Sequence, residues 1–167
     1  MTLNEVENIA IPESLSDNSR VWIYQSSRAL SDTEVEKLNA LCDEFTTQWA
    51  AHGQNLVAKH RVYFNRFVCL FVDETAHGAS GCSIDSSVRF IKSLEREMKI
   101  VLMSRTEVAF MIDQTVQIIP LNEIPEAVAS GSIDAHTAVF NNTVSTVKEM
   151  QQDWITPASK TWVARFF

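Results

Sequence analysis

Hydrophobic and polar positions follow two different periods in the first third of this chain. Residues 20–26 combine β-branched and aromatic side chains, which is typical of a strand. From Ser31 the period becomes that of an amphipathic helix, with an apolar stripe about a third of the circumference wide. The stripe consists of Val35, Leu38, Leu41, Cys42, Phe45 and Trp49. Ser31-Asp32-Thr33-Glu34 is a capping box that begins this helix, and Gly53 is expected to end it.

A second strand region and a second helix follow. Residues 67–72 are continuously apolar, which is typical of a strand buried on both faces. Two alternatives stay open for residues 56–74: one long strand, or two strands joined at Asn65-Arg66. Residues 84–99 repeat apolar side chains at helical spacing, so the pattern predicts a second amphipathic helix there.

The remaining predicted elements are short. They are a hairpin of 106–112 and 115–119 around Asp113-Gln114, a helix at 122–130, a strand at 137–140, a helix beginning at 146–149, and an apolar strand at 162–167. Strands and helices do not alternate regularly along the chain. We therefore expect an α+β fold, with a mainly antiparallel sheet, two principal helices packed on one face and short C-terminal helices.

Acidic residues are concentrated at the N-terminus of this chain of 167 residues and net charge -7. The first 19 residues contain Glu5, Glu7, Glu13 and Asp17, and no basic residue precedes Arg20. We predict an acidic mobile leader over 1–19 and a single α+β domain over 20–167. Nucleic acid is not an expected partner, because phosphates are held by basic surfaces. A membrane is not expected either, because no apolar run is long enough to span one.

The three cysteines, Cys42, Cys69 and Cys82, form no C-x-x-C pair. Their number and spacing favour neither a disulfide framework nor a structural zinc site, and we predict no metal site. The leader lacks the basic start and apolar core of a signal peptide. Free thiols without such a signal predict a cytoplasmic location.

Small and polar residues gather between the apolar strand at 67–72 and the second helix. Gly78 and Gly81 allow a close backbone approach, and the free amides at the start of a helix attract anions. One hypothesis is therefore that residues 78–85 hold a phosphate-type anion. The candidate ligand-binding residues are Ser80, Gly81, Ser83 and Arg89.

The same loop also carries the side chains of a thiol-dependent enzyme. The field of the helix start would stabilise a thiolate at Cys82, with His77 as its base and Asp85 to orient that base. A structural interpretation competes with both hypotheses. In it, Ser83 or Asp85 caps the helix, the glycines serve only the turn, and Cys82 is a small buried apolar residue.

Basic residues share one flank of the second predicted helix: Arg89, Lys92, Arg96 and Lys99. This stripe can meet an acidic partner or a phosphate. The alternative is a solvated helix face whose charges pair locally with acids such as Glu95.

Four stretches together resemble a small, uncharacterised bacterial family of about this length. They are residues 21–26, residues 78–92 (G-A-S-G-C-S-I-D-S-S-V-R-F-I-K), residues 139–142 and residues 164–166. The resemblance covers roughly residues 18–167. Members of that family are often labelled as ABC transporter ATPases, and the resemblance carries no catalytic residue to this chain. A Walker A loop is absent, because no lysine follows Gly81.

Taken together, these patterns predict a binding or interaction protein, with a small anionic ligand or another protein as its partner. The alternatives are an enzyme or binding protein with a phosphate-type anion at 78–85, and a thiol-dependent enzyme that uses Cys82. No pattern points to a particular cofactor.

Overall fold

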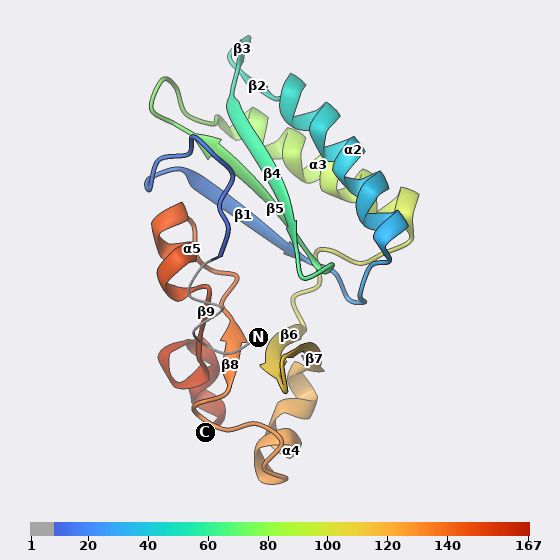
Figure 1. Ribbon diagram of the computed structural model, residues 1–167, viewed down its shortest axis with the longest axis vertical. Helices are drawn as coiled ribbons and strands as arrows, with labels where there is room; N and C mark the ends of the chain where they lie inside the picture. Colours follow the sequence, from blue (N-terminus) through green and yellow to red (C-terminus); the bar gives the residue numbers. More distant parts are fainter. Residues whose placement is uncertain (1–8) are drawn as a thin grey trace. The chain divides into compact units, whose positions relative to one another are not determined.

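The computed structural model describes residues 9–167, which form two compact units (Figure 1). The N-terminal unit comprises residues 11–104 with Ser145–Val147, and the C-terminal unit comprises Arg105–Val144 and Lys148–Phe167 with residues 9–10. Each unit has its own sheet, and every strand pair in the described part of the chain is antiparallel. The α+β prediction is confirmed, with the strands shared between two main sheets rather than gathered in one. A single domain over 20–167 stays a prediction.

The predicted leader is described only in part. Residues 1–8 lie outside the described residues. In the remainder, Ser19 is buried, and its carbonyl accepts a hydrogen bond from the Val147 N–H at 2.9 Å. The mobility of residues 1–19 stays a prediction.

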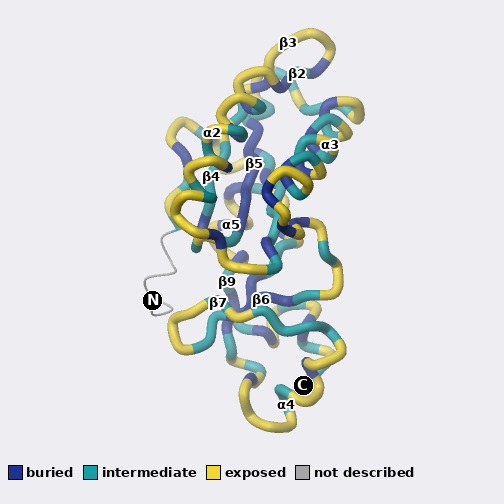
Figure 2. Tube along the Cα trace, turned by 90° about the vertical axis from the view of Figure 1, so that its right-hand side faces the viewer, coloured by how far each residue is buried: buried dark blue, intermediate teal, exposed yellow. Residues whose placement is uncertain are grey.

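The sheet of the N-terminal unit has strand β5 at its centre. Its order is β1-β5-β4, with β1 at Arg20–Gln25, β4 at Val57–Tyr63 and β5 at Phe67–Asp73. Each residue from Phe67 to Val72 is fully buried, and Figure 2 shows this strand in dark blue. Successive side chains of a strand point to opposite faces, so both faces of β5 are covered. The expectation from the continuous apolar run is confirmed.

Residues 56–74 form two strands, which settles the alternative left open by the sequence. The turn between them has Phe64 and Asn65 at its centre, with φ of 55° and 50°, and the Arg66 N–H donates to the Tyr63 carbonyl at 3.0 Å. Positive φ at both central residues matches the twist of a hairpin. The turn therefore lies one residue earlier than Asn65-Arg66.

Helices α2 (Asp32–Gln48) and α3 (Gly81–Met98) cover the same face of this sheet (Figure 1). Their shared core joins Leu38 of α2 and Ile91 of α3 to Val68 and Leu70 of β5. The predicted capping box begins α2, where the Ser31 hydroxyl accepts from the Glu34 N–H at 3.1 Å. Two principal helices on one face are thus confirmed. No helix in the described residues is both long and apolar enough to cross a membrane.

Gly53 does not end α2, contrary to the prediction. The helix ends at Gln48, and Trp49 follows in an extended conformation. Gly53 instead lies in the turn between strands β2 (Ala50–Ala51) and β3 (Gln54–Asn55), with φ of 77° beside His52 at 51°. A hairpin turn of this kind needs positive φ at both central residues, a demand that glycine meets as readily as it meets a helix C-cap.

The C-terminal unit contains a four-stranded sheet in the order β7-β6-β8-β9. Its elements are β6 (Glu107–Ile112), β7 (Thr115–Pro120), the 3-10 helix η1 (Leu121–Glu123), α4 (Ile124–Ala129), β8 (Ala138–Phe140), α5 (Val147–Asp153) and β9 (Ile155–Pro157). The predicted hairpin turn is confirmed, with φ of 48° at Asp113 and 64° at Gln114. Val108, Phe110 and Ile124 form the centre of a separate apolar core.

The last residues form 3-10 helices, so the predicted strand at 162–167 is wrong. These helices are η2 (Ala158–Lys160) and η3 (Trp162–Phe166). The Thr161 hydroxyl caps η3 by accepting from the Val163 N–H at 3.1 Å. Val163 is fully buried, whereas Trp162 is 43% exposed. A continuous apolar run does not show which of its residues face the core, and here only some of them do.

We expect protonation of His60 to destabilise the N-terminal unit. Its ring lies against α2, with Nε2 3.2 Å from the Asn39 side-chain oxygen and Nδ1 3.5 Å from an Asp43 carboxylate oxygen. Burial lowers the pKa of His60 below 6.5, although Asp43 opposes this shift. The folded state therefore binds a proton less readily than the unfolded state, and stability is lost as the pH falls below 6.5.

Urea denaturation at about pH 7.5 and about pH 5.5 measures this loss. The His60→Gln variant, which has no titrating ring, is expected to lose less stability over that interval than the wild type. His136→Gln, at an exposed position of the C-terminal unit, should behave like the wild type. An identical pH dependence for His60→Gln and the wild type would show that this histidine is not the titrating group.

Candidate functional site

Helix α3 begins at Gly81, three positions before the expected start at Ile84. Its N-cap is Ser80, whose hydroxyl accepts from the Ser83 N–H at 3.1 Å, while the Ser83 hydroxyl accepts from the Ser80 N–H at 2.7 Å. This is a capping box in which serine takes the place usually held by Glu or Gln. The N-cap is therefore Ser80, and neither Ser83 nor Asp85 has that role.

A carboxylate of the chain lies beside the loop that precedes α3. Glu74 Oε2 accepts from the Ala79 N–H at 2.9 Å, and Glu74 Oε1 lies 3.7 Å from the Arg20 guanidinium. A Cβ at Gly78 would lie only 2.5 Å from Glu74 Oε2, so a larger residue there would displace the Glu74 carboxylate. An incoming anion would meet the negative charge of Glu74 at this point.

The structure brings Ser80 and Ser83 together as partners of each other. Ser83 is 2% exposed, and its hydroxyl also donates to the Ser80 carbonyl at 2.8 Å. Gly81 is exposed, and nothing lies within 4 Å of a Cβ placed on it. These contacts favour the structural interpretation of the loop. A phosphate-type anion at 78–85 stays a prediction.

The three candidate catalytic residues do not form a hydrogen-bonded set. Cys82 is exposed on the first turn of α3, so its interpretation as a buried apolar residue is wrong. His77 is half-buried, and its buried Nε2 has no hydrogen-bond partner among the described residues. Asp85 is exposed. In the described part of the chain, no hydrogen bond or ion pair joins these residues to one another, and the thiol-enzyme hypothesis stays a prediction.

A cavity of about 330 Å³ lies where α2 ends and α3 begins. It is lined by Phe45, Gln48, Trp49, Ala50 and Ser86. The Trp49 indole N–H donates to the Ser83 carbonyl at 2.8 Å, and this bond holds the ring against α3. Phe45 stacks on Phe90 of α3 at a centroid distance of 4.2 Å. The aromatic wall of the cavity is therefore fixed by contacts between the two helices.

Arg89 does not line this cavity, but it is hydrogen-bonded to Ser86, which does. Its guanidinium donates to the Ser86 hydroxyl oxygen at 3.1 Å, and that hydroxyl donates to the Cys82 carbonyl at 3.1 Å. No sequence pattern indicated the cavity, because Phe45 and Trp49 belong to the same apolar stripe as the core residues of α2. The spacing of Ser86 and Arg89 by one helical turn was the available signal.

The basic stripe of α3 is exposed along its length. Glu95 does not pair with it, contrary to expectation, because its carboxylate accepts from the Leu102 N–H at 2.9 Å. Glu97 instead pairs with Lys37 of α2 at 3.5 Å. Within residues 9–167, no carboxylate forms an ion pair with Arg89 or with Lys92.

The described residues contain no group of three or more His, Cys, Asp or Glu side chains able to hold a metal ion. Comparisons with protein-family models, with curated proteins and with solved structures find no match to this chain. The resemblance of the sequence to a bacterial family therefore stays a prediction.

We expect a single reactive thiol in the native protein. Cys82 is exposed, whereas Cys42 and Cys69 are buried. Burial raises the pKa of Cys42 to about 12 and the pKa of Cys69 well above its ordinary value, so neither forms a thiolate near neutral pH. Iodoacetamide labelling read by mass spectrometry should modify Cys82 alone, and Cys82→Ser should remove the reaction. Rapid labelling of Cys42 or Cys69 in the folded protein would contradict the described packing.

Proposed function

We propose that this protein is a binding protein whose N-terminal unit takes a small ligand with a flat ring and an anionic group. The proposal rests on one observation, a cavity lined by Phe45 and Trp49 in which another lining residue, Ser86, is hydrogen-bonded to the Arg89 guanidinium. Its volume of about 330 Å³ is within the usual range for small-molecule sites.

The aromatic wall supports the flat part of this ligand. Phe45 and Trp49 lie with their ring centroids 5.1 Å apart, and Trp22 meets Trp49 edge-on at 5.6 Å. Packing on several sides holds these rings in place before a ligand arrives, which lowers the entropic cost of binding. The exposed Gln48 supplies an amide at the same cavity that can both donate and accept hydrogen bonds.

Arg89 is the residue that would bind the anionic group of the ligand. A guanidinium presents paired N–H donors that match the oxygens of a phosphate or carboxylate. In the described structure Arg89 makes a side-chain hydrogen bond to Ser86 and no ion pair, so its charge stays available. The loop at 78–85 is less suited to this role because the Glu74 carboxylate already accepts from the Ala79 amide.

A nucleoside monophosphate combines the two required parts, and it is the chemical class that we propose. We also propose a cytoplasmic location, supported by three free cysteines that would be kept reduced there. A net charge of -7 argues against nucleic acid as the partner.

Isothermal titration tests the proposal with nucleoside monophosphates, the matching nucleosides and ribose 5-phosphate. We expect a monophosphate to bind more tightly than either of its parts. Arg89→Gln should weaken monophosphate binding by about tenfold or more, because a hydrogen bond to a charged group contributes about 1.5–3 kcal/mol. The same variant should leave nucleoside binding nearly unchanged.

Arg96→Gln is the matched control, because Arg96 is an exposed arginine two turns further along the same helix. It should bind monophosphates like the wild type. Failure of every monophosphate to bind would refute the proposed function. An equal loss in Arg96→Gln would assign the effect to the overall charge of the helix and not to the cavity.

A further inference from the structure

The C-terminal unit contains a cavity of its own, independent of the site proposed above. It has a volume of about 300 Å³, and its wall is mostly polar. The polar residues that line it are Asn141, Thr143, Glu149, Asp153, Thr156 and Lys160. They come from the loop after β8, from α5, from β9 and from η2.

Thr156 is a buried polar residue in the wall of this cavity. It is only 6% exposed, and its hydroxyl has no hydrogen-bond partner among the described residues. The hydroxyl is not among the described polar atoms that are cut off from solvent, so within this buried residue it is the oxygen that remains open to the cavity. Because Thr156 lines the cavity, a ligand bound there can supply the missing partner.

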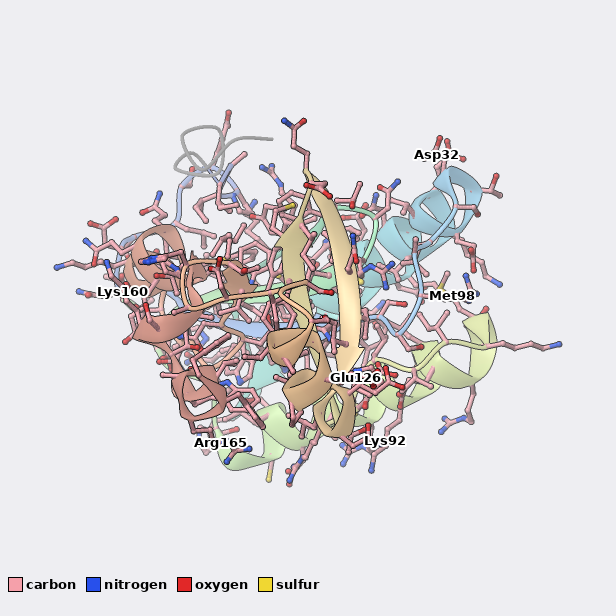
Figure 3. All side chains as sticks on the ribbon, turned by 90° about the horizontal axis from the view of Figure 1, so that it is seen from below. Asp32, Lys92, Met98, Glu126, Lys160 and Arg165 are labelled. Atoms are coloured by element: carbon pink, nitrogen blue, oxygen red, sulfur yellow. The ribbon has the colours of Figure 1, made fainter. Side chains whose placement is uncertain are left out.

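The cavity wall carries both signs of charge. Glu149 and Asp153 are four positions apart on α5 and so lie on one face of that helix. Lys160, labelled in Figure 3, is the last residue of η2. In the described part of the chain, neither Asp153 nor Lys160 forms an ion pair. Asp153 and Lys160 are thus opposite charges that line one cavity without an ion pair, which suits a ligand that carries both charges.

The side-chain amide of Asn141 contributes a hydrogen-bond donor to the cavity. Its side-chain oxygen accepts from the Thr143 hydroxyl at 2.5 Å and faces the Thr143 N–H at 3.4 Å. The oxygen is thereby occupied, and the NH₂ group of the same amide is left as a donor for an acceptor in the cavity.

We propose that this cavity binds a small zwitterion with a primary ammonium and a carboxylate, as in a free amino acid. Asp153 and Glu149 hold the ammonium, which also donates a hydrogen bond to the Thr156 hydroxyl oxygen. Lys160 and the Asn141 amide bind the carboxylate. The inference does not rest on the nucleotide proposal, because it concerns different residues in the other unit.

NMR titration of the full-length, ¹⁵N-labelled protein tests the inference with glycine, β-alanine and γ-aminobutyrate. This series increases the separation of the two charges, so one member should bind best. We expect the amide signals of Thr156 and Lys160 to shift. Propylamine and propionate each carry one of the charges, and each should bind at least tenfold more weakly than the best zwitterion. Equal binding of a singly charged probe, or no shift with any zwitterion, would overturn the proposal.

Three variants test the assigned roles. Asp153→Asn and Lys160→Gln should each weaken binding of the best zwitterion by about tenfold. Thr156→Val keeps the shape of the side chain, so it should weaken binding severalfold without lowering the melting temperature, since no internal hydrogen bond is lost. Glu126→Gln and Lys148→Gln, at exposed positions outside the cavity wall, should bind like the wild type. Unchanged binding in Thr156→Val, or equal losses in the two controls, would also overturn the proposal.

Discussion

The hydrogen bond from the Trp49 indole N–H to the Ser83 carbonyl, 2.8 Å long and buried, is the constraint on which the N-terminal unit depends. It joins the end of α2 to the first turn of α3 across 34 positions of sequence. In apolar surroundings such a bond is expensive to leave unmade. Trp49 makes this bond from an extended backbone conformation, directly after α2 ends at Gln48. The same indole forms one wall of the cavity between the two helices.

The serine hydroxyls at the start of α3 and the backbone amide just before it already have hydrogen-bond partners within the chain, although the sequence predicted that they could bind a ligand. Ser80 and Ser83 satisfy each other, and Glu74 satisfies the Ala79 amide. These hydroxyl and amide groups, which were predicted to bind an anion, therefore make the hydrogen bonds that begin α3. The outward side of that helix is different, because Arg89 is hydrogen-bonded to Ser86 and forms no ion pair with a carboxylate in the described residues. Burial and capping, rather than composition, decide which polar residues stay available.

Patterns with a single physical meaning predicted the fold well. The capping box at Ser31 and the apolar run at 67–72 each fit one structure, and the structure has them. Patterns that fit two structures equally well gave wrong predictions. Gly53 suits a helix stop and a hairpin turn equally, and the apolar run at 162–167 fits a strand as well as a 3-10 helix. Neither cavity could be predicted from the sequence. An apolar stripe does not show which of its residues pack in the core and which line a cavity. Thr156 lies in a strand of three residues, which is too short to show an alternating pattern.

The most direct measurement is the free energy of unfolding of Trp49→Phe in urea, compared with that of Trp22→Phe. Both variants replace an indole in the same aromatic cluster, but only Trp49 donates its N–H to a buried carbonyl. Trp49→Phe should therefore cost about 0.5–1.5 kcal/mol more than Trp22→Phe, because it removes a buried hydrogen bond to the Ser83 carbonyl. Equal losses in the two variants would contradict the central role of this hydrogen bond.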